Sequence, residues 1–151
     1  MAGFSFRLET VLKQRMTIED QRQRDLAQVM RERMILEGQL RQMQQTISES
    51  RQQLADGLVG RVDLGGVSNF ARYSAQARLR AQAIVARLAG IEKRVAAARQ
   101  LLVEAMRDRK AMEILRDREY ARWRRSEAQR EAAELDEVGT QGYLRQVAYE
   151  R

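Results

Sequence analysis

The chain has 151 residues with a formal net charge of +7, and it contains no proline, cysteine or histidine. Their absence removes the usual structural zinc ligands, thiolate nucleophiles and histidine bases, so we expect no enzyme, no metal or cofactor site and no small-molecule substrate. Aromatic residues make up 5% and charged residues 32% of the sequence. This balance suits long helices joined by a narrow apolar seam better than a thick globular core.

The first predicted helix covers residues 5–56. The hydroxyl of Ser5 is expected to cap its first turn, and Gly57 is expected to end it in a left-handed conformation. Apolar residues alternate between three-residue and four-residue steps, the heptad pattern of helices that coil around a partner. The wholly polar stretch 19–25 interrupts this pattern. The ladder consists of Leu26, Val29, Arg33, Leu36, Leu40, Met43 and Ile47.

A glycine-rich connection is predicted at residues 57–68, because glycines this dense interrupt helices. A phosphate-binding loop is not expected there, since no Gly-Lys-Ser/Thr sequence follows and no strand precedes it. The apolar residues of the connection are expected to pack against the end of the hairpin. They are Leu58, Val59, Val62 and Leu64.

The second predicted helix covers residues 69–138, with Ser68 or Asn69 as its cap and Gly139 and Gly142 ending it. Residues 139–151 are expected to form a flexible C-terminal tail. The helix carries its own apolar ladder with heptad steps. The ladder consists of Ala77, Ala81, Ile84, Leu88, Ile91, Val95, Ala98 and Leu102.

The two ladders match layer by layer when the chain folds back at the connection. Leu36 then faces Leu88, and Met43 faces Ala81. Pairing large residues with small ones is expected to let the backbones approach closely. We therefore predict one all-α domain over residues 1–151, a long two-helix antiparallel coiled-coil hairpin whose second helix is longer and overhangs the first.

The overhang is the candidate binding region. The register places Phe4 near Glu119 or Tyr120, so residues beyond about Ala121 have no partner on the first helix. Basic residues in the overhang are followed by a carboxylate cluster, whose charge opposes the helix macrodipole. A helix of this kind persists best when another molecule holds it. Trp123 is expected to be exposed there and available to such a partner.

Two aromatic residues begin the second helix, near the hairpin tip. Phe70 falls on the seam opposite Leu54, so it is expected to be buried. Tyr73 lies beside the seam and is a candidate partly exposed anchor, since tyrosines are favoured at interfaces.

Other classes of protein fit the sequence less well. Arginines are interleaved with carboxylates, few aromatics accompany them, and no helix-turn-helix or finger spacing is present, so no nucleic-acid partner is expected. No segment approaches the roughly 20 apolar residues that span a bilayer, and charges within residues 1–15 are atypical of a signal peptide. We expect a cytoplasmic protein.

Three segments resemble the FliJ-type flagellar export proteins. They are the opening FSFRLETVLKQR at 4–15, the basic stretch AMRDRKAMEILRDR at 105–118 and the acidic close EAAELDE at 131–137. Their order and spacing and the total length agree with that family. The resemblance implies a coiled-coil hairpin similar to the central stalk of rotary ATPases. It also implies a cytoplasmic place at the flagellar type III export apparatus, peripheral to the inner membrane.

The resemblance further implies three partners: the hexameric export ATPase, the cytoplasmic domain of the export gate and, for some members, export chaperones. The paired ends of the hairpin are implied to enter the ATPase ring. The residues implied to bind the ATPase are Phe6, Arg7, Leu8, Arg109, Lys110, Leu115, Arg116, Arg122, Trp123, Arg124, Arg125, Leu135 and Asp136. The residues implied to bind the gate are Gln39, Met43, Phe70, Tyr73 and Ala77. Some members carry aromatics at Thr46 and Ser50, where this sequence does not.

Two alternatives stay open on sequence alone. One is a dimeric coiled-coil adaptor or chaperone of another system, and the less favoured one is a basic nucleic-acid-binding protein. A rod-like monomer in light scattering would favour the self-paired hairpin over a parallel dimer.

Overall fold

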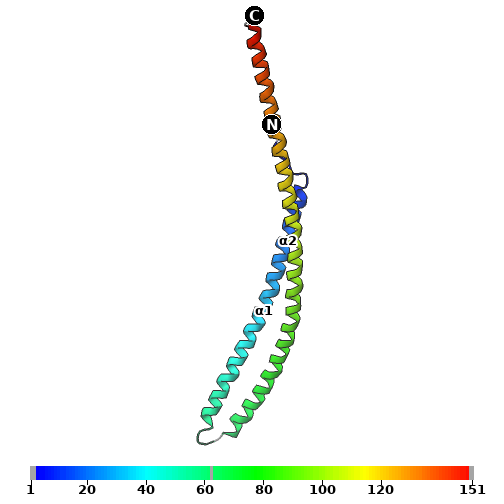
Figure 1. Ribbon diagram of the computed structural model, residues 1–151. Coiled ribbons are helices and arrows are strands. Elements are labelled where there is room, and N and C mark those ends of the chain that lie inside the picture. The colour runs from blue at the N-terminus through cyan, green and yellow to red at the C-terminus, as the bar shows by residue number, and fades with distance from the viewer. Residues whose placement is uncertain (1–2, 62, 150–151) are drawn as a thin grey trace. The chain divides into compact units, whose positions relative to one another are not determined.

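The computed structural model describes residues 3–61 and 63–149. In this part of the chain there are two α-helices, α1 (Glu9–Gly57) and α2 (Leu64–Tyr149), and no strand. The helices pack against each other and α2 is the longer one (Figure 1), which confirms the predicted fold class. Their contacts gather in two compact units, Met1–Glu19 with Ala105–Arg151, and Asp20–Glu104.

The core of the unit Asp20–Glu104 follows the predicted ladders. Val29, Leu36, Ile91 and Val95 are buried together, and further ladder residues pack against them. Burial of such apolar side chains contributes about 25 cal/mol per Å² removed from water. The additional ladder residues are Leu26, Ile84 and Leu88.

Ion pairs across the same seam repeat the register of the ladders. Arg33 Nε lies 3.0 Å from Glu92 Oε1, and Arg94 Nη1 lies 2.6 Å from Glu32 Oε2. Arg33 stands at a ladder position, yet its guanidinium is only half-buried and also contacts Glu37 at 2.8 Å. Because two carboxylates surround this arginine, the ladder tolerates a charge there.

The turn between the helices is shorter than the sequence predicted. Asp63 caps α2, in place of Ser68 or Asn69, because its Oδ1 accepts a hydrogen bond of 2.9 Å from the backbone N–H of Gly65. A Cβ added at Gly65 would lie 3.2 Å from that carboxylate oxygen, so glycine leaves room for the cap.

The left-handed position of the turn is Gly60, with a φ of 110°, and the expectation of such a residue at Gly57 is wrong. Gly57 instead forms the last residue of α1. The expected packing of the apolar turn residues is also wrong for Leu58, Val59 and Leu64, which are 45%, 86% and 77% exposed. Val62 lies outside the described residues.

The outer helix ends differ from their predicted positions as well. α1 begins at Glu9 and not at Ser5. The N–H of Glu9 donates a hydrogen bond of 3.1 Å to the carbonyl oxygen of Phe6, which forms a turn immediately before the helix. α2 continues through Gly139 and Gly142 to Tyr149, where a flexible tail was predicted. A glycine costs a helix interior only about 1 kcal/mol, and no proline stops the helix. Residues 150 and 151 of that predicted tail lie outside the described part.

The register can be tested by disulfide trapping, since the chain has no native cysteine. The pair Leu36→Cys and Leu88→Cys should oxidise within one molecule, because the register places these two residues of the packed seam opposite each other. Mass spectrometry of the oxidised monomer measures the bond. The control pair Leu36→Cys and Val95→Cys is offset by one heptad, about 10 Å, and should not crosslink. Equal crosslinking of the two pairs would contradict the register.

Candidate functional site

An aromatic cluster holds the chain before α1 against α2 in the unit Met1–Glu19 with Ala105–Arg151. The ring centroid of Phe4 lies 5.2 Å from that of Tyr120 and 5.8 Å from that of Trp123. Tyr120 and Trp123 stack at 5.8 Å. The predicted position of Phe4 beside Tyr120 is confirmed. The expected free exposure of Trp123 is wrong, because Phe4 covers part of its ring and leaves it half-buried.

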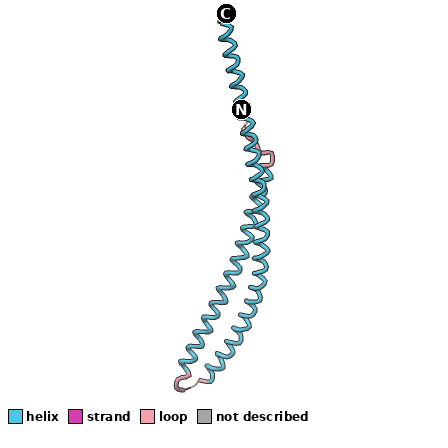
Figure 2. The backbone as a smooth tube through the Cα atoms, in the orientation of Figure 1, coloured by secondary structure: helices cyan, strands magenta, loops and turns pink. Residues whose placement is uncertain are grey.

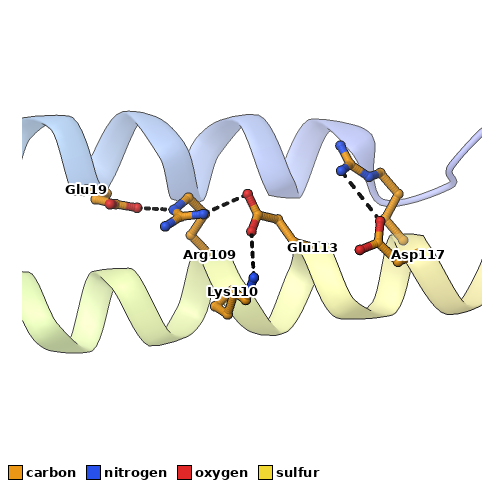
Figure 3. A network of polar contacts seen from close by, with 6 residues as sticks. Glu19, Arg109, Lys110, Glu113 and Asp117 are labelled. Carbon is orange, nitrogen blue, oxygen red and sulfur yellow. Dashed lines mark hydrogen bonds and ion pairs between the residues drawn. The ribbon is translucent and has the colours of Figure 1, made fainter.

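A network of ion pairs joins α1 and α2 in the same unit, between Glu19 on α1 and residues 109–113 on α2. Glu19 is buried, and its carboxylate accepts a hydrogen bond from Arg109 Nε (Figure 3). Arg109 also donates to Glu113 at 2.7 Å, and Lys110 Nζ lies 3.8 Å from the other oxygen of Glu113. The polar stretch that interrupts the apolar ladder therefore starts with a charge that α2 satisfies.

These contacts shift the pKa values of the paired groups. The hydrogen bond from Arg109 lowers the pKa of Glu113 below its ordinary value, and the bonds to Glu19 and Glu113 raise the pKa of Arg109. In the other unit, the hydrogen bond from Arg94 lowers the pKa of Glu32 in the same way. Each of these shifts favours the charged form of the group concerned, Glu32, Glu113 or Arg109.

Beyond the aromatic cluster, the described side chains of α2 are not covered by other parts of the chain. Every side chain described between Ala128 and Tyr143 is exposed, and Leu135 is 73% exposed. Arg122, Arg124 and Arg125 precede this stretch and are exposed too. Such a surface offers guanidinium groups and isolated apolar side chains to another molecule.

The residues predicted to bind the ATPase divide by exposure. Phe6 is buried, and Arg109 and Trp123 are engaged inside the unit. Leu8, Leu115 and Arg116 are half-buried. The exposed members are Arg7, Lys110, Arg122, Arg124, Arg125, Leu135 and Asp136.

A groove of about 480 Å³ opens between the helices in the unit Asp20–Glu104, and we call it the hairpin groove. From α1 it is lined by Gln39, Gln42, Met43 and Thr46. From α2 it is lined by Tyr73, Gln76, Ala77, Arg80, Ala83 and Ile84. The close approach expected where large residues face small ones does not seal the surface here, since the small side chains of α2 leave this space open.

The structure brings four of the five predicted gate residues together in one groove. Gln39, Met43, Tyr73 and Ala77 all line the hairpin groove. Phe70 is half-buried and lines a second hollow of about 430 Å³ near the turn, which Tyr73 also borders. Figure 2 shows that turn as the loop that joins the two helices. Tyr73 is 39% exposed and therefore available as an anchor.

Sequence reasoning missed Arg80 and the carboxylate partner of Arg109. Arg80 lines the hairpin groove from a position beside the ladder, one heptad before Arg87. That heptad spacing was visible in the sequence. The pairing of Glu19 with Arg109 was not, because it depends on how a long side chain reaches across the seam.

Two other kinds of site are absent from the part of the chain that the structure describes. Neither helix, over its described residues, has a stretch long and apolar enough to cross a membrane. No cluster of three metal-ligating side chains occurs among residues 3–61 and 63–149.

The fold and these surfaces define a two-helix coiled-coil protein that presents exposed charged and grooved faces for contact with other molecules. The sequence matches the family described as "Flagellar FliJ protein" over residues 4–148. The chain belongs to this family, a non-catalytic cytoplasmic component of the flagellar export apparatus. No curated protein and no solved structure matched the chain.

Removing Arg109 should destabilise the chain, because Glu19 would remain buried without a partner. We expect Arg109→Leu to lower the melting temperature measured by circular dichroism. The double variant Glu19→Leu with Arg109→Leu should recover most of that loss, since an apolar pair fits the seam. Arg116→Leu, at a surface ion pair with Asp117, is the control and should melt like the parent chain. A double variant less stable than Arg109→Leu would contradict the pairing.

Stability should fall in acid through Glu32 and Glu113. Their folded-state pKa values lie below the ordinary value of 4.5. Their contribution is therefore complete above about pH 4.5 and is lost as the pH falls through the lowered folded values. Thermal melts between about pH 6 and pH 3 measure this loss. The variant Glu32→Gln with Glu113→Gln should show a shallower acid dependence, and an unchanged slope would argue against these pairs.

Proposed function

We propose that this chain is the stalk-like component that binds the hexameric export ATPase, promotes its assembly or turnover, and couples it to the export gate. The observation that carries the proposal is the uncovered end of α2. All described side chains from Ala128 to Tyr143 are exposed on a helix of a family whose members serve flagellar export. A helix that extends past its intramolecular partner supports insertion into a ring-shaped partner.

The ATPase would be met by the exposed basic residues beside that end. Arg122, Arg124 and Arg125 form no ion pair among the described residues, so their charge is available to acidic groups of a partner. Leu135 supplies an apolar contact. Phe6 and Trp123 act indirectly by shaping the paired end, because Phe6 is buried and Trp123 contacts Phe4 in the chain before α1.

The export gate would bind at the hairpin groove. The groove joins an apolar floor at Met43 and Ala77 with a half-exposed tyrosine, a combination typical of protein–protein contacts. Export chaperones are further proposed partners. Association with the gate would keep the protein at the cytoplasmic side of the inner membrane.

The ATPase surface can be tested by reversing Arg122, Arg124 and Arg125 to Glu. We expect loss of association with the export ATPase, at least about tenfold, with unchanged helicity by circular dichroism. The measurement is co-sedimentation or calorimetric titration with the purified ATPase. The matched control reverses Arg31, Arg41 and Arg51, which are also exposed but lie on α1, and should bind like the parent chain. Undiminished binding by the first variant would refute this site.

A further inference from the structure

One flank of the unit Asp20–Glu104 carries three arginines at heptad intervals on α2. They are Arg80, Arg87 and Arg94. Arg80 lines the hairpin groove, and Arg87 and Arg94 line a further hollow of about 260 Å³ with Glu32 and Gly90. Heptad positions fall on the same side of a coiled-coil helix, so the two hollows follow one flank of the seam.

The three arginines differ in what α1 offers them. Arg94 donates two hydrogen bonds to Glu32, at 2.6 and 3.4 Å. One heptad further along α1 the equivalent residue is Gln39, and after another heptad it is Thr46. In an antiparallel coiled coil, residues that face each other still do so after one heptad forward on α1 and one heptad back on α2, so Gln39 faces Arg87 and Thr46 faces Arg80. Arg87 and Arg80 therefore face positions where the carboxylate is missing.

Arg80 and Arg87 accordingly have no carboxylate partner among the described residues. Both residues are exposed, and neither forms an ion pair within the described chain. Between them lies Ala83, and Gly90 follows Arg87 at the corresponding place of the next heptad. Small residues between arginines leave holes that apolar side chains of a third helix can fill.

We propose that this flank binds an acidic amphipathic helix of the export gate, which packs on the hairpin as a third helix of the coiled coil. The apolar ridge of that helix would pack on Met43, Tyr73, Ala83 and Ile84 over about 20 Å. Its glutamates or aspartates, one heptad apart, would pair with Arg80 and Arg87 as Glu32 pairs with Arg94. The proposal rests on the proposed gate-binding function of the same groove, and it adds the chemistry of the segment that enters it.

The proposed binding site ends at Arg94, because this arginine is already paired with Glu32. Its two hydrogen bonds cross the flank and occupy the guanidinium that would otherwise continue the row. An incoming helix therefore meets two free arginines and not three. This gives the partner a defined acidic pattern: two carboxylates separated by one heptad beside an apolar stripe.

The test uses the full chain and two synthetic three-heptad peptides with leucine at a and d. One carries glutamate at the flanking e and g positions, and the matched peptide carries glutamine there. We expect calorimetry to give about tenfold tighter binding of the glutamate peptide, since two exposed ion pairs distinguish the peptides. Arg80→Glu with Arg87→Glu should remove that preference. Arg78→Glu with Arg99→Glu, exposed and outside the groove lining, should keep it.

A second variant places the missing carboxylates on α1 of the chain itself. Gln39→Glu with Thr46→Glu should pair with Arg87 and Arg80 as Glu32 does with Arg94, so the chain stays helical and binds the glutamate peptide about tenfold more weakly. Equal binding of the two peptides would overturn the proposal. So would equal weakening by the Arg78 and Arg99 control, or unchanged binding by both groove variants.

The purified cytoplasmic domain of the gate separates this inference from the proposed function. If the gate domain binds and the arginine reversal does not weaken it, the gate site stands and the acidic helix is refuted. If the gate domain does not bind while the glutamate peptide does, the gate function fails and the groove chemistry stands. Self-association that the Arg80 and Arg87 reversal abolishes in light scattering would identify a second copy as the occupant and overturn the proposal.

Discussion

The heptad seam between α1 and α2 imposes one constraint on every other feature: a single facing pair of residues determines all the others in its unit. In the unit Asp20–Glu104 the packing of Leu36 with Leu88 and the ion pair of Arg94 with Glu32 obey the same register. In the other unit the contact of Phe4 with Tyr120 obeys it too. A shift by one heptad would bury different side chains and separate each of these pairs.

The register also divides the arginines into two groups. Arg33, Arg94 and Arg109 face carboxylates of the same chain and contribute to the packing of the helices. Arg80 and Arg87 lie at positions where the facing residue is neutral, so their charge stays available to another molecule. Net charge alone does not make this distinction, since it depends on which residue stands opposite each arginine.

The apolar seam is interrupted where its side chains are small or polar, and a groove or an ion pair takes its place there. Ala77 and Ala83 leave the hairpin groove open beside Met43. At Glu19 the apolar ladder stops and a buried ion pair replaces it, an arrangement that is costly to break from one side and that favours a unique pairing. Packing, specificity and binding surfaces thus come from different stretches of the same two helices.

Much of the candidate site followed from the pattern of residues along the chain. The spacing of Gln39 and Met43 on one helix and of Tyr73 and Ala77 on the other placed them near one another, and they line one groove. The exposure of Trp123 was wrong for a physical reason. The register placed Phe4 beside Tyr120, but it did not show that the ring would also reach Trp123, about one turn further along α2, and cover the indole.

The sequence by itself determined the helical class, the pairing of the ladders and their register. Heptad periodicity is a spacing of residues along the chain, so it can be read directly from the sequence. Only the tertiary structure decided which charges are satisfied, where the seam opens into a groove and where the helices end. Those features depend on the reach of side chains across the seam and on competition between caps, as when Asp63 starts α2 ahead of Ser68. Such outcomes are set by three-dimensional distance and not by spacing in the sequence.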